Sequence, residues 1–260
     1  MTIIPPVVPP LPIASPYARA LPPGAAFDWL RAGWRDLVTD PAPSLLYGLV
    51  VFLLSAAIIA GLIGFEWDYA LFPAIAGFLV FAPALAIGLY DKSRTLELGE
   101  PVSLRHMLLP HPRAGGQVLF TGALLCGLML LWMRAAVIIY AIFFGVQPFP
   151  GLDHIAPMLF TTTTGLAMLI VGTAVGGLFA AFSFAISAFA IPMMLDQRVD
   201  ALTAMGTSWA LVLNNLRALL VWAAIVLALF LLSVLTGLLG LILIFPWLGH
   251  ATWHAYRAVR

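Results

Sequence analysis

Two histidines four residues apart, His250 and His254, form the clearest pair of side chains in this sequence that could do chemistry. A helix places positions i and i+4 on one face, and imidazole nitrogens there can bind zinc or haem iron. His106 and His111 could extend such a site, but no cysteine or carboxylate constellation completes it. We therefore predict no metal and no cofactor, and favour a simpler interpretation, the water-exposed end of a membrane helix.

The composition indicates what kind of element carries this pair. Of 260 residues, 63% are hydrophobic and 9% are charged, whereas about a quarter of the residues of a soluble domain are charged. Apolar windows of about 20 residues, long enough to cross a bilayer, recur along most of the chain. The chain is therefore predicted to be an all-α, polytopic membrane helix bundle whose partner is the lipid bilayer, with no nucleic acid. The single cysteine, Cys126, excludes an internal disulfide.

Proline content divides the chain into a tail and a membrane domain. Eight prolines among the first 24 residues predict that residues 1–25 are a disordered cytoplasmic tail. Residues 26–260 are predicted to form a single membrane domain. At its start, Phe27, Leu30 and Trp34 recur at helical spacing opposite charged residues, which predicts a short amphipathic helix lying at the level of the lipid headgroups.

Six transmembrane helices are predicted, at residues 44–65, 69–90, 117–144, 158–195, 216–235 and 238–254. The third and fourth spans form the middle of the domain, at residues 117–195. At about 1.5 Å per residue, the fourth apolar run (residues 158–195) is much longer than the hydrocarbon layer is thick. It must therefore tilt, break or project from the membrane, and a break or kink is expected because four glycines and Pro192 provide weak points. A second short interfacial helix is predicted before the fifth span, around residues 199–212.

The distribution of charge predicts the orientation of these spans. In the six-span topology the loops on one side contain Glu66, Asp68 and Asp153 and no lysine or arginine. The opposite side holds every lysine and arginine other than Arg134, namely Arg19, Arg31, Arg35, Lys92, Arg94, Arg105, Arg113, Arg198, Arg217, Arg257 and Arg260. Because cytoplasmic loops are enriched in cations, we expect a bacterial inner-membrane protein with both termini in the cytoplasm.

An internal similarity bears on the two histidines. The segment "PALAIGLYDKSR" at residues 83–94 aligns with "PWLGHATWHAYR" at residues 246–257. This predicts two parallel hairpin repeats, at about residues 26–95 and 197–257, each with an interfacial helix and two spans. The positions equivalent to the histidines are Ile87 and Asp91. In both segments an aromatic residue precedes an arginine, which is typical of a membrane-interface anchor, so replacing both histidines with glutamine is expected to leave protein abundance unchanged.

Three further groups of polar residues are candidates for function. Arg134 lies within the third span, where it either snorkels to the headgroups or pairs with Glu66, Asp68 or Asp153. Hydroxyl side chains at Thr161, Thr162, Thr163 and Thr164 favour helix packing over a substrate path. Asp196 and Arg198 at the exit of the fourth span favour a solvated helix start, with Asp200 as its cap.

Four blocks of the sequence carry a family resemblance: "WLRAGWRDLVTDPAPSLLYG", "GLYDKSRTLELGEPVSL", "IPMMLDQRVDALTAMGTS" and "GHATWHAYR". Together they resemble the predicted integral membrane proteins of domain-of-unknown-function family 2189, found in proteobacteria, over about residues 27–257. The resemblance implies a six-span inner-membrane protein and supplies no catalytic residues.

The sequence favours a non-enzymatic role. No glycine-rich phosphate loop, Ser-His-Asp set or paired carboxylates is recognisable. Aromatic interfacial helices and seams of small residues indicate an accessory, scaffold or assembly protein for another membrane complex. The alternative is a transporter or channel for a small or amphipathic solute, which the repeats, Arg134 and the interrupted fourth run suggest. Homo-oligomers remain compatible with either role.

Overall fold

The computed structural model describes residues 15–145 and 149–260, apart from the side chains of Asp68, Leu152, Asp153 and Ala156. Every regular element in these residues is a helix, which confirms the all-α membrane-bundle class. The elements are α1 (Ala25–Val38), α2 (Pro41–Gly64), the 3-10 turn η1 (Asp68–Ala70), α3 (Leu71–Leu85), α4 (Ile87–Glu97), α5 (Leu104–Leu108), α6 (Gly115–Phe144), α7 (Leu152–Thr161), α8 (Thr163–Ser187), α9 (Ala190–Asp196), α10 (Ala201–Asn214), α11 (Leu216–Leu235) and α12 (Leu241–Val259).

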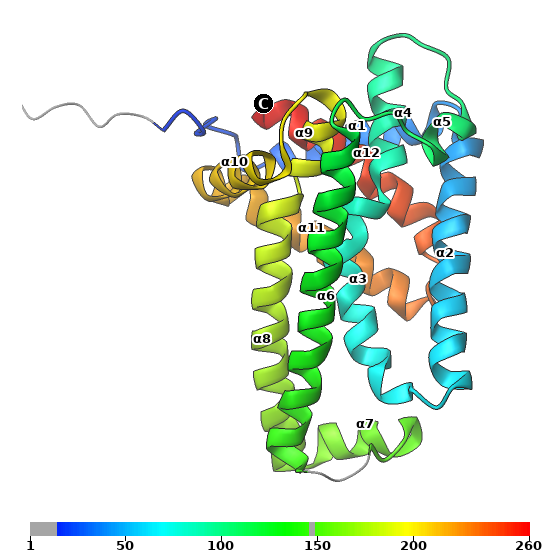
Figure 1. Cartoon of the computed structure of the whole chain (residues 1–260), viewed down its shortest axis with the longest axis vertical. Helices are drawn as coiled ribbons and strands as arrows, with labels where there is room; N and C mark the ends of the chain where they lie inside the picture. The colour runs from blue at the N-terminus through cyan, green and yellow to red at the C-terminus, as the bar shows by residue number, and fades with distance from the viewer. Residues whose placement is uncertain (1–14, 146–148) are drawn as a thin grey trace, which may run out of the picture.

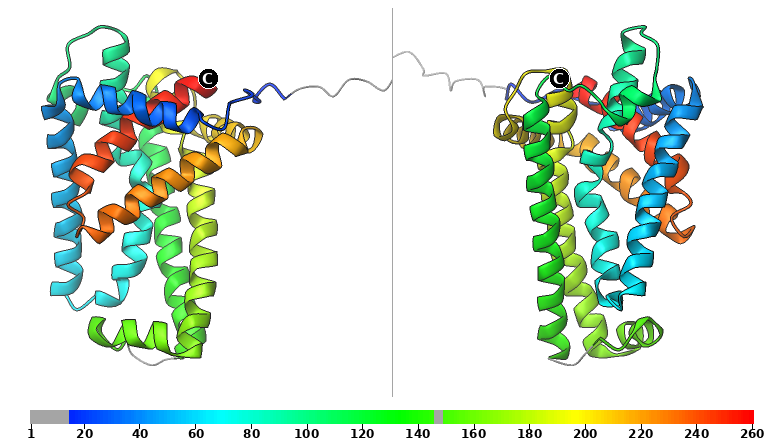
Figure 2. Two further views of the ribbon diagram at one scale, coloured as in Figure 1. Left: turned by 180° about the vertical axis from the view of Figure 1, so that it is seen from behind. Right: turned by 45° about the vertical axis from the view of Figure 1, so that its right-hand side comes forward.

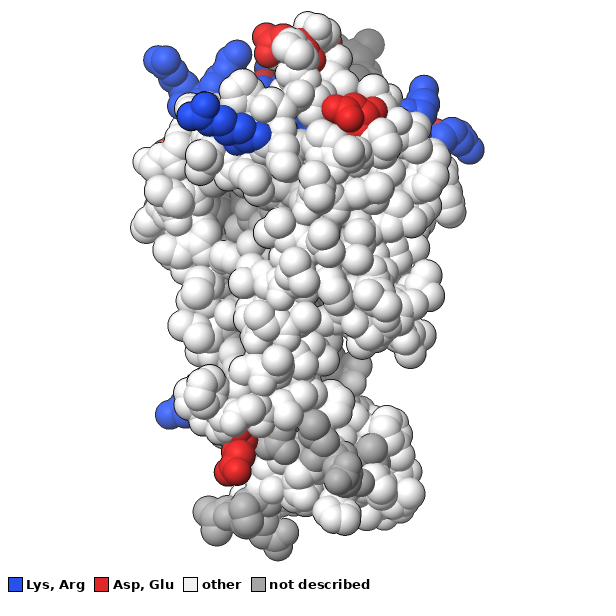
Figure 3. Space-filling view, turned by 90° about the vertical axis from the view of Figure 1, so that its right-hand side faces the viewer, with Lys and Arg blue, Asp and Glu red and all other residues white. Residues whose placement is uncertain are grey.

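The helices form an elongated bundle whose short helices gather at its two ends (Figure 1). α2, α3, α6 and α8 extend along the long axis, and α7 lies across one end, which we call the far end. α1, α5, α9, α10 and the C-terminus lie at the other end. Lysine and arginine side chains cluster at that end above an uncharged belt (Figure 3), so we call it the charged end.

The fourth apolar run is broken twice, as its length predicted. Thr162 separates α7 from α8 in an extended conformation, and its hydroxyl accepts a hydrogen bond from the backbone N–H of Gly165 at 2.9 Å. A threonine in this position caps the helix that follows. At the other end, α8 stops at Ser187 and α9 continues from Ala190. Only α8 is therefore upright, and α7 can lie across the far end.

Six upright spans are not confirmed. Within residues 15–145 and 149–260, five stretches are long and apolar enough to cross a membrane: Pro41–Gly64, Leu71–Glu97, Gly115–Phe144, Thr163–Asp196 and Leu216–Leu235. α12 is not among them, and the hairpin between α11 and α12 turns well short of the far end (Figure 2). The physical reason is that the apolar part of α12 before His250 runs only from Leu241 to Gly249, roughly 13 Å at about 1.5 Å per residue, under half of a hydrocarbon layer of about 30 Å.

The core of the charged end is built around α12, which packs against α1, α2, α4 and α11. Trp253 and Tyr256 of α12 are fully buried there. The helices approach closely at glycines: a Cβ atom on Gly33 of α1 would lie 2.4 Å from the backbone nitrogen of Ala251, and one on Gly48 of α2 would lie 2.3 Å from the carbonyl oxygen of Ile242. Any other residue at these two positions would force the helices apart.

The two parallel hairpin repeats are not confirmed either. Their elements do recur in the same order, with α1 before α2, α3 and α4, and α10 before α11 and α12. However, α2 has 24 residues and extends toward the far end, whereas α11 has 20 and crosses the bundle obliquely (Figure 2). The two hairpins therefore enter the bundle to different depths.

Part of the predicted N-terminal tail contacts the bundle. Asn215, which precedes α11, donates a hydrogen bond from Nδ2 to the carbonyl oxygen of Tyr17 at 2.8 Å, and its Oδ1 accepts one from the backbone N–H of Arg19 at 2.9 Å. Residues 1–14 lie outside the described residues. The chain just before α1 is thus attached to the beginning of α11 at the charged end.

Candidate functional site

A chain of buried polar side chains joins three helices at the charged end. Lys92 of α4 donates hydrogen bonds to Oγ of Ser44 in α2 at 2.8 Å and to the carbonyl oxygen of Asp40 at 2.7 Å. Oγ of Ser44 lies 2.9 Å from Nε2 of His250 in α12, and Oγ of Ser93 in α4 lies 2.9 Å from Nδ1 of the same ring. The two serines and His250 have no exposed surface, and Lys92 is 1% exposed.

The charged groups at the two ends set the direction of every hydrogen bond in this polar chain. The ammonium group of Lys92 can only donate, so Ser44 accepts from it and turns its own proton toward Nε2 of His250. The neutral ring then carries its proton on Nδ1 and donates to Ser93. Ser93 donates in turn to the carboxylate of Asp36, which only accepts when ionised. Each donor therefore has an acceptor, as buried polar groups require.

Asp36 attaches α1 to the end of this chain. Nε2 of His254 also lies 2.8 Å from its Oδ2. Burial raises the pKa of Asp36, but hydrogen bonds from His254 and Ser93 outweigh burial and hold the pKa below its usual value. A lowered pKa means that the carboxylate stabilises the folded protein at neutral pH, and that this contribution is lost as the pH falls through the lowered value.

The structure corrects the interpretation of His250 as the water-exposed end of a helix. α1, α2 and α4 cover this part of α12, so the ring is buried among serines instead of facing the headgroups. The predicted interface anchors are also wrong, because Tyr90 and Trp253 are 2% and 1% exposed. Aromatic residues at the end of an apolar run lie at the interface only when no neighbouring helix covers them.

The polar chain joins residues that sequence reasoning did not connect. Asp36, Ser44, Lys92 and Ser93 were not proposed as site residues, although one signal was visible: Lys92 is the only lysine in a chain rich in arginine. Neither these four side chains nor His250 lines the large cavity described below or the smaller cavity beside Trp222. The arrangement therefore links α1, α2, α4 and α12 and has no approach for a substrate through those cavities.

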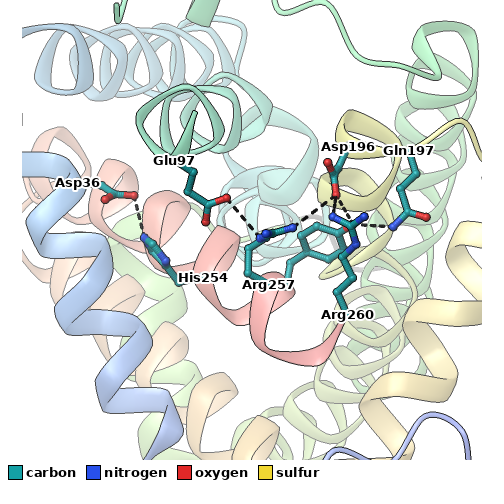
Figure 4. A network of polar contacts seen from close by, with 8 residues as sticks. Asp36, Glu97, Asp196, Gln197, His254, Arg257 and Arg260 are labelled. Carbon is teal, nitrogen blue, oxygen red and sulfur yellow. Dashed lines mark hydrogen bonds and ion pairs between the residues drawn. The ribbon is translucent and has the colours of Figure 1, made fainter. Parts of the chain in front are cut away.

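A second polar network connects the end of α12 to its neighbours (Figure 4). Arg257 lies 3.3 Å from Oε2 of Glu97 and 4.0 Å from Oδ2 of Asp196, and Arg260 also contacts Asp196. The hydroxyl of Tyr256 donates to Asp196 at 3.0 Å. Asp196 is thus a shared acceptor that holds the C-terminal helix against α9. The sequence had indicated only a solvated helix start here.

Arg198 and Asp200, which follow Asp196 in the sequence, lie at the surface. Asp200 accepts a hydrogen bond from the backbone N–H of Thr203 at 2.9 Å, which confirms it as the cap of α10. These two residues therefore belong to the exposed beginning of α10, while Asp196 belongs to the contact between α9 and α12.

The histidines that could hold a metal do not form a complete ligand set. The rings of His106 and His111 lie 6.4 Å apart between centroids. In the part of the chain that the structure describes, no three His, Cys, Asp or Glu side chains lie together as a metal site. Both nitrogens of His250 face serine hydroxyls, so neither nitrogen is directed toward a site where a metal ion could bind.

Arg134 is exposed on α6. No hydrogen bond or ion pair joins it to Glu66 or to any other described side chain, and the side chain of Asp153 lies outside the described residues. A long arginine side chain on the surface of a membrane helix can extend toward the headgroups. This placement favours snorkelling over a closed polar interior.

We predict that Arg134→Leu leaves thermal stability in detergent unchanged, within about 0.5 kcal/mol, or raises it, because the change removes a charge from an apolar surface. The control on the same helix is Trp132→Ala, which removes a buried ring whose Nε1–H donates to the carbonyl oxygen of Pro73 at 3.0 Å. That variant should lose about 3 to 5 kcal/mol. Loss of folded Arg134→Leu protein that neutralising Glu66, Asp68 or Asp153 restores would contradict the prediction.

The four threonines at Thr161–Thr164 are exposed at the junction of α7 and α8. The hydroxyls of Thr161 and Thr162 each donate at 2.6 Å to the carbonyl oxygen four residues earlier, at Pro157 and Met158. These two hydroxyls are therefore satisfied by the backbone of their own helix. All four stand outside the cavity described next.

A large apolar cavity lies between the upright helices. Its volume is about 1460 Å³, and its walls come from α3, α6, α8 and α11, with residues of α7 and α10 at its two ends. Trp132, Phe179 and Leu220 are among the lining side chains, and nearly all the others are also apolar. Arg134 does not line it. Such walls suit hydrocarbon and do not offer hydrogen bonds to a polar solute.

Comparison with known proteins shows which family this chain resembles. Residues 71–196, from α3 to α9, match the model of the predicted integral membrane proteins DUF2189. This part of the chain is therefore similar to the DUF2189 family. The match includes Lys92 and Ser93 of the polar chain and most of the cavity walls, whereas Asp36, Ser44 and His250 fall outside it. No curated protein and no solved structure matches the chain.

Proposed function

We propose that this protein is a non-enzymatic accessory, scaffold or assembly protein of the bacterial inner membrane, with both termini in the cytoplasm. In this proposal it acts by binding another membrane protein complex through the surface of its upright helices. The observation that supports it best is the separation of polar and apolar groups: Ser44, Lys92, Ser93 and His250 of the polar chain are buried, and the large cavity between the upright helices is lined almost entirely by apolar side chains.

The same separation argues against a path for a polar solute. Channels and transporters line their routes with carbonyls, charged side chains or broken helix ends. Here Arg134 and the threonines at the break before α8 stand outside the cavity, and Thr162 is used to cap its own helix. The surface left for function is the apolar exterior, where Ile142 of α6 and Ile170 of α8 are 73% and 71% exposed.

The second candidate function is transport of an amphipathic solute. The volume and the apolar walls of the cavity favour it over transport of a polar one, because a hydrocarbon chain would be accommodated there. It differs from the accessory role in requiring net movement of the solute by the protein alone.

Photocrosslinking in native membranes tests the proposal. A photoreactive residue at Ile142 or Ile170 is expected to give discrete adducts with another membrane protein at native expression. The matched control is Leu125 of α6, which is 0% exposed and should give no such adduct. Purified protein in liposomes is expected to leave the flux of a fluorescent fatty acid unchanged. Only lipid adducts at both exposed positions, together with a protein-dependent flux, would refute the accessory role and favour transport.

A further inference from the structure

The short hairpin of α11 and α12 leaves part of the membrane layer without a protein wall. Because the hairpin turns before the far end, the space beyond α11 is bounded only by the helices that extend further, among them α3, α6 and α8 (Figure 2). The cavity of about 1460 Å³ occupies this region, and one face of α11, with Leu219, Leu220 and Ala223, forms part of its lining.

Neither water nor vacuum fills a space of this kind in a stable protein. Protein interiors are close-packed, and cavities lined by apolar groups do not hold ordered water. The volume also exceeds the roughly 300 to 1,000 Å³ of sites for drug-sized ligands. An occupant must therefore be large and almost entirely apolar, as the acyl chains of a membrane lipid are.

The two ends of the cavity favour acyl chains over a partner helix. Ile155 and Leu159 of α7 line it toward the far end, and Trp209 and Leu213 of α10 line it toward the charged end. Both short helices lie across the long axis of the bundle (Figure 1). A membrane-spanning helix inside the cavity would have to pass through them, whereas flexible chains that enter from the side would not.

A cation lies at the edge of the cavity on the charged end. Arg217 is exposed in the first turn of α11, three residues before Leu220 and seven before Ala224, both of which line the cavity. Residues at these spacings lie on the same side of a helix. No hydrogen bond or ion pair to another described side chain occupies Arg217, and arginine binds phosphate oxygens in two-pronged contacts.

We propose that the cavity is a binding site for an anionic phospholipid, whose acyl chains lie between α3, α6, α8 and α11 and whose phosphate contacts Arg217. The site is separate from the buried polar chain and independent of the accessory role, so either proposal can fail alone. The lipid would fill the space that the short hairpin leaves open and connect α11 to the upright helices.

Two glycines allow the cavity to be filled without disturbing the protein. Gly172 and Gly177 of α8 both line it, and a Cβ atom on either would meet no atom within 4 Å. Gly172→Phe and Gly177→Phe should therefore occupy the site from within. Gly127→Phe on α6 is the matched control, because Gly127 also has open space around it but does not line the cavity.

The experiment is native mass spectrometry of protein taken from vesicles of equal parts phosphatidylglycerol and phosphatidylethanolamine. Wild-type protein and Gly127→Phe are expected to retain one phosphatidylglycerol, and the two filling variants should retain about tenfold less. Arg217→Gln should keep the lipid but lose roughly fivefold of the preference for phosphatidylglycerol, since one cation near the surface contributes that much.

A second measurement covers variants that unfold in the gas phase. Phosphatidylglycerol with brominated chains should quench the fluorescence of Trp132 and Trp209, which line the cavity, more strongly in wild-type protein than in Gly172→Phe. Equal lipid retention and equal quenching in wild-type and filled variants would overturn the proposal. So would a photoreactive residue at Gly172 that links to a second protein instead of a lipid.

Discussion

His250→Ala is expected to lower the free energy of unfolding by about 3 to 5 kcal/mol. The change removes the ring from between Ser44 and Ser93 and leaves both buried hydroxyls without this partner. It also leaves Lys92 bound to a serine that has lost its own acceptor. Thermal unfolding in detergent measures the loss, which reverses the expectation from sequence that replacing His250 would be neutral.

The control for this variant is His254→Gln on the same helix. His254 contacts Asp36 at 2.8 Å, but its side chain is 23% exposed, so water screens the interaction and can replace it. A loss of about 1 kcal/mol or less is expected. Equal effects of the two substitutions would mean that the polar chain through His250 does not hold the four helices together.

Gly33→Ala is also expected to be strongly destabilising, with a loss of about 3 kcal/mol, toward the upper end of what overpacking usually costs. The new Cβ would lie 2.4 Å from the backbone nitrogen of Ala251 and 2.7 Å from its Cα, and backbone atoms inside a helix cannot move aside. α1 would have to withdraw from α12, which also separates Asp36 from His254. Thermal unfolding in the same detergent measures the effect.

Gly206→Ala in α10 provides the comparison. A Cβ atom there meets nothing within 4 Å, so only the helix propensity of alanine remains, and a gain of up to about 1 kcal/mol is expected. Combining Gly33→Ala with His250→Ala should cost less than the sum of the two losses, since both act on the packing of α12. Full additivity would show that the glycine contact and the polar chain are independent.

The placement of polar side chains is where prediction from sequence was least complete. Asp200 could be recognised as a cap because a cap depends on the residues that immediately follow it. Asp36, Ser44, Ser93 and His250 could not, because they lie on separate helices and meet only after those helices pack. An aromatic residue before an arginine predicts an interface anchor, but Tyr90 and Trp253 are buried by neighbouring helices.

The sequence alone predicted a membrane helix bundle, because continuous apolar runs of about 20 residues are typical of membrane helices, which satisfy their own backbone hydrogen bonds in lipid. A break or kink in the run at residues 158–195 was also expected, since a single upright helix of that length does not fit the hydrocarbon layer. Only the tertiary structure decided how deeply α11 and α12 enter, and hence that an apolar cavity remains beyond them. It likewise decided that Lys92 and His250 are buried, because burial depends on partners supplied by distant helices.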